Sequence, residues 1–306
     1  MSCACHNNGP NNGPLTYHNP PGVDASASEA CFTESTIASE PTLSGGCNVF
    51  DCWDHCAPCS LGTIWREYCY LDGVHAPHNV ILQRTPECLT PSRQFDMLLG
   101  VQRWAFLVGD SHSASIKPGV ERAVQSAGMG FSWLSFTGNG CGYHYGARGV
   151  CYQARNLIDA QLRTHLMPGD LVIIKHARWK NGGGNMNLLR QLYTSILQPR
   201  GAKLVIVGDP AWLSRWARYC IYAPQNCYSP TTVVDSNALL APLADEFPGN
   251  VLYISIWNLF CDANHCQGQV PGTTTWAYFD DNHLTRAGGE YLGPYFCAEL
   301  SAAGFL

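Results

Sequence analysis

Residues 104–120, WAFLVGDSHSASIKPGV, combine a short apolar run, a sharp turn and the start of a helix. The apolar run WAFLV has no polar residue on either face, which is typical of a strand buried in a parallel sheet. Gly109, Asp110 and Ser111 follow it directly, and Asp and Ser favour tight turns and helix N-caps. We therefore expect a strand–turn–helix unit with Ser111 at the carboxyl end of a buried strand.

Apolar runs and helical segments alternate through the rest of the chain. Further runs of strand length are 131–136, 171–176, 203–208 and 251–256. Apolar residues recur at helical intervals in four segments: 113–127, 153–166, 186–198 and 235–247. A final helix should begin at Thr285 and be kinked or broken at Pro294. Strands that alternate with helices predict βαβ units with right-handed crossovers. The expected fold class is α/β, a three-layer α/β/α domain with a flavodoxin-like doubly wound parallel sheet of about five strands.

The sequence divides into three parts. Residues 1–46 are rich in Asn, Gly, Pro, Ser and Thr and predict an extended or disordered arm. Residues 47–100 hold six cysteines with few regular patterns, which indicates a disulfide-held cap or lead-in. The α/β pattern occupies 101–306.

Composition excludes two classes of partner. The chain has 306 residues, a formal net charge of −5 and 13% charged residues, without a Lys/Arg cluster that could neutralise nucleic-acid phosphates. No apolar run is long enough to span a membrane. The residues after Met1 lack the basic and then apolar order of a signal peptide. If the protein is secreted, its signal peptide has been removed from this chain.

Sixteen cysteines favour an oxidising compartment, in which disulfides persist. Three pairs are close enough in sequence to be local staples: Cys141/Cys151, Cys220/Cys227 and Cys261/Cys266. CWDHCAPC at 52–59 has the spacing of an iron–sulfur motif of radical enzymes, but no predicted strand precedes it, so disulfides are the favoured interpretation. CACH at 3–6 contains zinc-ligand residue types without a tetrahedral spacing. We expect no metal or other cofactor.

Ser111 has the position of a nucleophile. Ligands of doubly wound sheets bind beyond the carboxyl ends of the strands, and the amides that begin the following helix favour negative charge. A serine there can attack a carbonyl while neighbouring N–H groups hold the oxyanion. The alternative is a plain turn with a helix N-cap.

The segment YFDDNHLTRAGG at 278–289 offers a base with its partner. Asp280 lies three residues before His283 and can return to the same side of a tight turn, whereas Asp281 faces away. Asp280 would then bind one imidazole nitrogen while the other faces Ser111. The alternative is a surface loop with Thr285 as a helix cap.

GDSH at 109–112 and the late DDNHLT at 280–285 resemble the SGNH/GDSL hydrolase superfamily. More narrowly, the chain resembles SGNH domains fused to integral-membrane acyltransferases that O-acetylate bacterial polysaccharides. Four further stretches carry this resemblance: FTGNGCGY at 136–143, PGDLVIIKHARWKN at 168–181, GAKLVIVGDP at 201–210 and NLFCDANHC at 258–266. The resemblance covers about residues 101–306 and implies an SGNH-type catalytic domain there.

The resemblance implies roles for the two motifs. Ser111 would be the nucleophile, His283 the base and Asp280 its orienting partner. The oxyanion hole would use the amide of Ser111 and that of Gly140 or Gly138.

One departure from the wider superfamily concerns the third block, where an Asn usually donates to the oxyanion. Here the block reads KHARW at 175–179, with no Asn until Asn181. Arg178 is the expected third donor, with Asn181 in reserve, although Arg178 could equally form a structural ion pair. Trp179, Asn181 and His112 are expected to contact substrate. Trp212 and Trp276 lie in predicted loops, where each could stack on a sugar ring or simply belong to the core.

These observations predict a secreted serine esterase that removes or transfers O-acyl groups, O-acetyl above all, on carbohydrate through an acyl-Ser111 intermediate. A polysaccharide O-acetyltransferase would use the same residues. The non-enzymatic alternative is a secreted structural or binding protein with an SGNH fold. The expected partner is an ester-bearing carbohydrate or a small ester.

Overall fold

The computed structural model describes residues 70–71, 101–136, 143, 148–177, 182–215, 217, 229–230, 238–261, 265–278 and 280–306. The predicted arm 1–46 and, apart from residues 70–71, the predicted cap 47–100 lie outside the described residues.

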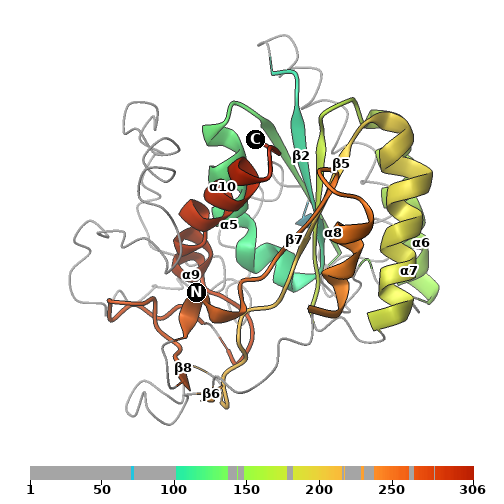
Figure 1. The fold of residues 1–306 in the computed structure, drawn as a ribbon. Coiled ribbons are helices and arrows are strands. Elements are labelled where there is room, and N and C mark those ends of the chain that lie inside the picture. The colour runs from blue at the N-terminus through green and yellow to red at the C-terminus, as the bar shows by residue number, and fades with distance from the viewer. Residues whose placement is uncertain are drawn as a thin grey trace, which may run out of the picture.

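A parallel sheet forms the centre of the molecule (Figure 1). Its strands are β1 (Tyr70–Leu71), β2 (Trp104–Gly109), β3 (Gly130–Phe136), β4 (Leu171–Lys175), β5 (Lys203–Val207) and β7 (Val251–Ile254). The order is β1-β3-β2-β4-β5-β7, and every neighbouring pair is parallel. The five longer strands are those predicted from the apolar runs, and their order is that of a flavodoxin-like sheet. The fold-class prediction is therefore confirmed.

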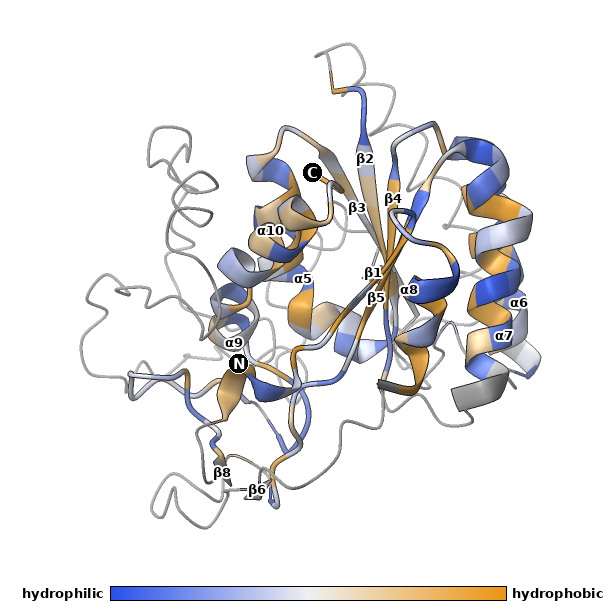
Figure 2. Ribbon diagram, in the orientation of Figure 1, coloured by the Kyte–Doolittle hydropathy of each residue, from blue (hydrophilic) through white to orange (hydrophobic). Residues whose placement is uncertain are grey.

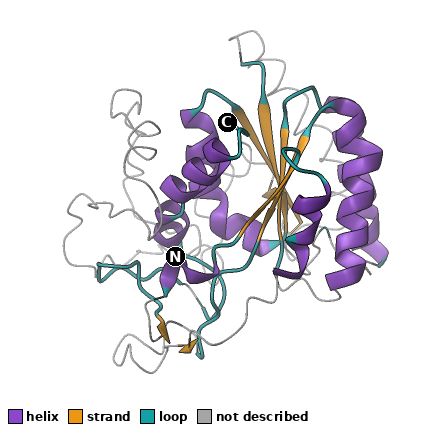
Figure 3. Cartoon of the chain, in the orientation of Figure 1, coloured by secondary structure: helices purple, strands orange, loops and turns teal. Residues whose placement is uncertain are grey.

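Helices cover both faces of the sheet (Figure 3). They are α5 (Ser111–Ser126), α6 (Gly149–His165), α7 (Gly182–Leu192), α8 (Pro242–Glu246), α9 (Arg286–Tyr291) and α10 (Gly293–Ala302). A π-helical turn, Tyr193–Leu197, and a 3-10 turn, Gln198–Arg200, continue α7. Helices α5, α9 and α10 pack together on one face, while α6, α7 and α8 lie on the other (Figure 1).

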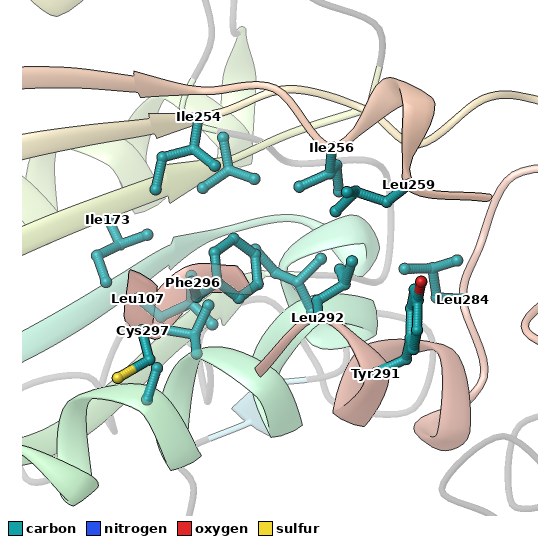
Figure 4. Packing of buried hydrophobic residues seen from close by; sticks show 14 of the residues in the cluster. Leu107, Ile173, Ile254, Ile256, Leu259, Leu284, Tyr291, Leu292, Phe296 and Cys297 are labelled. Atoms are coloured by element: carbon teal, nitrogen blue, oxygen red, sulfur yellow. The ribbon is translucent and has the colours of Figure 1, made fainter. Parts of the chain in front are cut away.

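Alternate side chains of each strand enter two different cores, as the pleat requires. On β2, Phe106 and Val108 belong to the cluster under α6 and α7, whereas Ala105 and Leu107 belong to the cluster under α5 and α10. Figure 4 shows part of the second cluster, in which Phe296 of α10 packs near Leu107. Both faces of the central strands are therefore apolar, and orange segments run along the sheet in Figure 2.

Two helix boundaries follow from single residues. Thr285 caps α9, because its Oγ1 accepts a hydrogen bond from the amide of Gly288 at 3.1 Å. Pro294 stands in the first turn of α10, where its missing N–H costs nothing, so the predicted break lies between α9 and α10. Of the predicted helix 235–247, the structure describes 238–247, which form a 3-10 turn, Ala238–Leu240, followed by α8, which starts anew at Pro242.

Gly109 has no room for a side chain at the end of β2. A Cβ there would lie 1.9 Å from the carbonyl oxygen of Lys175 and 2.7 Å from Cβ of Ser113. Gly109→Ala should destabilise the fold by about 3 kcal/mol or more, since relief requires β2 and β4 to separate. Urea unfolding measures the loss, with Gly293→Ala as the matched control, because its Cβ would meet nothing closer than 3.6 Å. Equal stability of the two variants would contradict this close approach.

Candidate active site

Asp110 shapes the turn between β2 and α5. It is the N-cap of α5, and its carboxylate accepts hydrogen bonds from the amides of His112 at 2.9 Å and Ala177 at 3.0 Å. Its main-chain oxygen accepts from the amide and hydroxyl of Ser113 at 2.9 and 2.7 Å. Burial raises the pKa of Asp110, although the hydrogen bonds from the amides of Ala177 and His112 and the positive charge of Lys175 oppose this shift. The result is a rigid turn that places Ser111 as the first residue of α5.

Ser111, His283 and Asp280 form one chain of hydrogen bonds. Oγ of Ser111 lies 2.7 Å from Nε2 of His283, and Nδ1 of His283 lies 2.6 Å from Oδ2 of Asp280. The serine and histidine are 172 positions apart in sequence, so this contact depends on the fold. The three residues that the motifs singled out are thus brought together with nucleophile–base–carboxylate geometry.

Asp280 makes three contacts with the segment that follows it. Besides the His283 ring, its carboxylate accepts the main-chain amides of His283 at 2.7 Å and Asn282 at 2.8 Å. Burial alone would raise the pKa of Asp280, but the hydrogen bond and charge attraction of His283, aided by these amides, lower it below its ordinary value. Asp281 instead accepts the side-chain amide of Asn282 at 2.5 Å. The neighbour that holds the imidazole is therefore Asp280.

Backbone contacts join the two motif-bearing segments. A Cβ on Gly119 of α5 would lie 2.3 Å from the carbonyl oxygen of Gly289 of α9, and one on Gly289 would lie 2.4 Å from that of Ser115. The main chain at Asp280 and Asp281 accepts hydrogen bonds from residues 217 and 213. The loop that carries His283 is thus held against the helix that begins at Ser111.

A buried polar layer lies near these residues. Nζ of Lys175, at the end of β4, forms an ion pair with Asp209, which follows β5, and both side chains are 1% exposed. Nζ of Lys175 also donates to the carbonyl oxygen of His176 at 2.9 Å. His112 is 3% exposed, and its ring packs against that of His283. Neither Lys175 nor Asp209 was predicted to belong to the site, although the sequence contains two signals: a lysine that ends an apolar strand and an Asp in GDP after the next strand.

The other predicted site residues are placed as follows. Gly138, Gly140, Arg178, Trp179 and Asn181 lie outside the described residues. Trp212 is partly buried and its ring stacks near that of His112, while Trp276 packs against Gly268. These two contacts are with protein rather than with an open surface.

Disulfides are present among the described cysteines. Cys261 is bonded to Cys266, as the close sequence spacing predicted. Cys151 is also part of a disulfide, and so, separately, is Cys297. Cys220 and Cys227 lie outside the described residues. Within the part of the chain that the structure describes, no group of three His, Cys, Asp or Glu side chains is arranged to hold a metal ion, and no helix is both long and apolar enough to cross a membrane.

A doubly wound parallel sheet with a hydrogen-bonded serine after its first long strand defines a domain of the SGNH type. The family model described as "SGNH domain (fused to AT3 domains)" matches residues 68–297, and the chain belongs to this family. Among solved structures the chain is similar to the periplasmic domain of a lipopolysaccharide acetyltransferase from Salmonella ser. Paratyphi A. The identity is 16% and the TM-score 0.46, over 78% of this chain and 100% of that chain. No curated protein matches the chain.

Proposed function

We propose that the protein is a serine esterase that removes O-acyl groups, principally O-acetyl, from carbohydrate through an acyl-Ser111 intermediate. The observation that carries the proposal is the hydrogen-bonded chain from Ser111 through His283 to Asp280, with contacts of 2.7 and 2.6 Å. Membership of the SGNH family supports the reaction class. The buried turn at Asp110 supports a preorganised nucleophile, because it fixes the backbone on either side of Ser111.

Acylation would begin when Nε2 of His283 takes the hydroxyl proton of Ser111 as Oγ bonds to the ester carbonyl carbon. Asp280 would stabilise the resulting imidazolium. The amide of Ser111, which lies at the N-terminus of α5, would face the oxyanion. We propose Gly138 or Gly140 as the second donor and Arg178 as the third, with Asn181 in reserve.

Collapse of the tetrahedral intermediate would break the bond to the leaving alcohol, which takes the proton back from His283. Water would then attack acyl-Ser111 while His283 accepts its proton. When this second tetrahedral intermediate collapses, His283 would return the proton to Oγ, which releases the carboxylic acid and regenerates Ser111. If a sugar hydroxyl attacks in place of water, the product is a new ester. Trp179 is proposed to contact the carbohydrate.

Transfer is the second candidate function, and the observation that favours it is the family itself, whose members are SGNH domains fused to AT3 domains. Both reactions use the same three residues and differ in the acceptor. Release of p-nitrophenol and acetate from p-nitrophenyl acetate, with and without an added oligosaccharide, separates them. Hydrolysis gives one free acetate for each p-nitrophenol released. Transfer gives acetylated oligosaccharide in place of part of the free acetate. If p-nitrophenol is released no faster with the protein than in buffer alone, the result would favour a non-catalytic binding protein.

We further propose an extracytoplasmic location, because disulfides persist in oxidising compartments. Mass spectrometry of the non-reduced protein should find few free thiols, with Cys261–Cys266 and Cys220–Cys227 linked. Mostly free thiols, or bound zinc or iron, would contradict this location.

Replacing Cys261 and Cys266 together by Ser should cost about 2 kcal/mol of unfolding free energy and loosen the loop before Asp280.

A further inference from the structure

The imidazole of His112 lies directly beside that of the proposed base. The ring centroids of His112 and His283 are 4.3 Å apart with an interplanar angle of 40°. The ring of Trp212 stacks near His112, at 6.1 Å and 18°. The His112 side chain is 3% exposed, whereas that of His283 is 18% exposed. His112 was predicted to contact substrate, and in the structure its ring packs between the ring of the proposed base and that of Trp212.

The surroundings of the His112 ring restrict its movement. Its Nδ1 lies 3.6 Å from Oδ1 of Asp209, which is beyond hydrogen-bond distance, so this contact is electrostatic. Asp209 is in turn fixed by the ion pair with Lys175. The backbone of His112 is tied to the Asp110 carboxylate. The ring that packs on His283 is therefore held by burial, by the neighbouring ring of Trp212 and by the fixed backbone at the start of α5.

The acyl-enzyme creates a need for such a support. Once Oγ of Ser111 is esterified, Nε2 of His283 loses the proton donor that it contacts at 2.7 Å. The bond from Nδ1 to Asp280 and the packing of the His112 ring on that of His283 remain in the acyl-enzyme, and both help to fix where Nε2 points. A single hydrogen bond leaves rotation about its axis open, and a flat ring packed against the imidazole restricts this rotation.

We propose that His112 is a positioning residue that keeps the ring of His283 aimed at Ser111, above all during deacylation. This inference rests on the proposed function. It departs from a substrate-contact role, because it assigns the effect of His112 to kcat rather than to KM.

The surroundings keep His112 neutral. Burial lowers the pKa of His112 well below its ordinary value, and the charges of Lys175, His283 and His176 act in the same direction. Asn282 and the nearby carboxylate of Asp209 oppose this without reversing it. A neutral aromatic ring tolerates the imidazolium that forms on His283 during the reaction, whereas a second cation would repel it.

The test compares His112→Ala, His112→Phe and His112→Leu in the full chain, with p-nitrophenyl acetate as substrate. His112→Ala should lower kcat about tenfold to a hundredfold without raising KM, because a misaimed base slows above all the attack of water on acyl-Ser111. His112→Phe should restore most of kcat, since a flat ring packs as imidazole does, whereas the non-planar His112→Leu should not. The acid limb of kcat/KM against pH should have the same midpoint in His112→Phe and wild type.

Two further measurements separate positioning from stability and from the proposed function. Val124→Ala, equally buried on α5, should lose stability while keeping kcat. The downfield proton resonance of the His283–Asp280 hydrogen bond should persist in His112→Phe and broaden or disappear in His112→Ala. This signal is read without turnover, so it tests positioning even if wild type proves inactive, in which case only the proposed function fails.

Three results would overturn the inference. One is a raised KM with unchanged kcat in His112→Ala, which would restore substrate contact. Another is a His112→Phe variant no better than His112→Leu, a comparison that remains if His112→Ala does not fold. The third is an acid limb of kcat/KM that moves to higher pH in His112→Phe, because such a shift would show that His112 carries a charge in wild type.

Discussion

Ser111→Ala should abolish labelling by a fluorophosphonate and lower kcat for p-nitrophenyl acetate by about 10⁴-fold or more. The reason is the position of Oγ, which is 2.7 Å from the nitrogen that would take its proton. Folding should be nearly unchanged, because the caps of α5 are made by Asp110 and not by the Ser111 hydroxyl.

Ser115→Ala is the matched control for this variant. Ser115 lies on the same helix, one turn after Ser111, and its hydroxyl is directed to the main-chain oxygen of Ser111 at 3.3 Å. This variant should keep both labelling and most of the turnover. Label retained in Ser111→Ala, or lost in Ser115→Ala, would assign the nucleophile elsewhere.

Asp280→Asn should lower kcat by about 10⁴-fold, whereas Asp281→Asn should be mild. The carboxylate of Asp280 holds Nδ1–H of His283 and so leaves Nε2 free to accept the serine proton. An amide in its place can favour the other tautomer and cannot stabilise the imidazolium. Oδ1 of the Asn can still accept the amides of Asn282 and His283, so thermal unfolding should change little.

The neighbouring carboxylate provides the control. Asp281 bonds Asn282 rather than the imidazole, and its main-chain oxygen, which the substitution keeps, accepts the amide of Leu213 at 2.8 Å. Equal losses at both positions, or a larger loss at Asp281, would contradict the register of the triad. A neutral Asp280→Asn would indicate a Ser–His dyad.

The fold was predictable because its signals are local. The strands of a parallel sheet are apolar on both faces, so runs such as LVIIK at 171–175 stand out without any knowledge of their neighbours. Thr285 and Pro294 act within one helical turn, and both boundaries were confirmed. Residues 235–247 were predicted as one helix because apolar spacing continues across Pro242, which in the structure starts a new helix.

The site was predictable only where motifs mark it. Ser111, Asp280 and His283 stand in two short patterns whose order and spacing are informative. The ion pair of Lys175 with Asp209 joins the ends of two strands 34 positions apart, and no local pattern records that proximity. The packing of the His112 ring against that of His283 also depends on how α5 meets the loop of His283, which spacing along the chain does not encode.

The proposed reaction must pass through an acyl group on Ser111, and this intermediate can be trapped. The protein is mixed with excess p-nitrophenyl acetate, quenched in acid during turnover, digested and analysed by mass spectrometry. We expect one added acetyl group, on Ser111 in the peptide that spans the turn between β2 and α5, in wild type and not in Ser111→Ala. An acetyl group on another residue, or turnover that continues undiminished in Ser111→Ala, would contradict it.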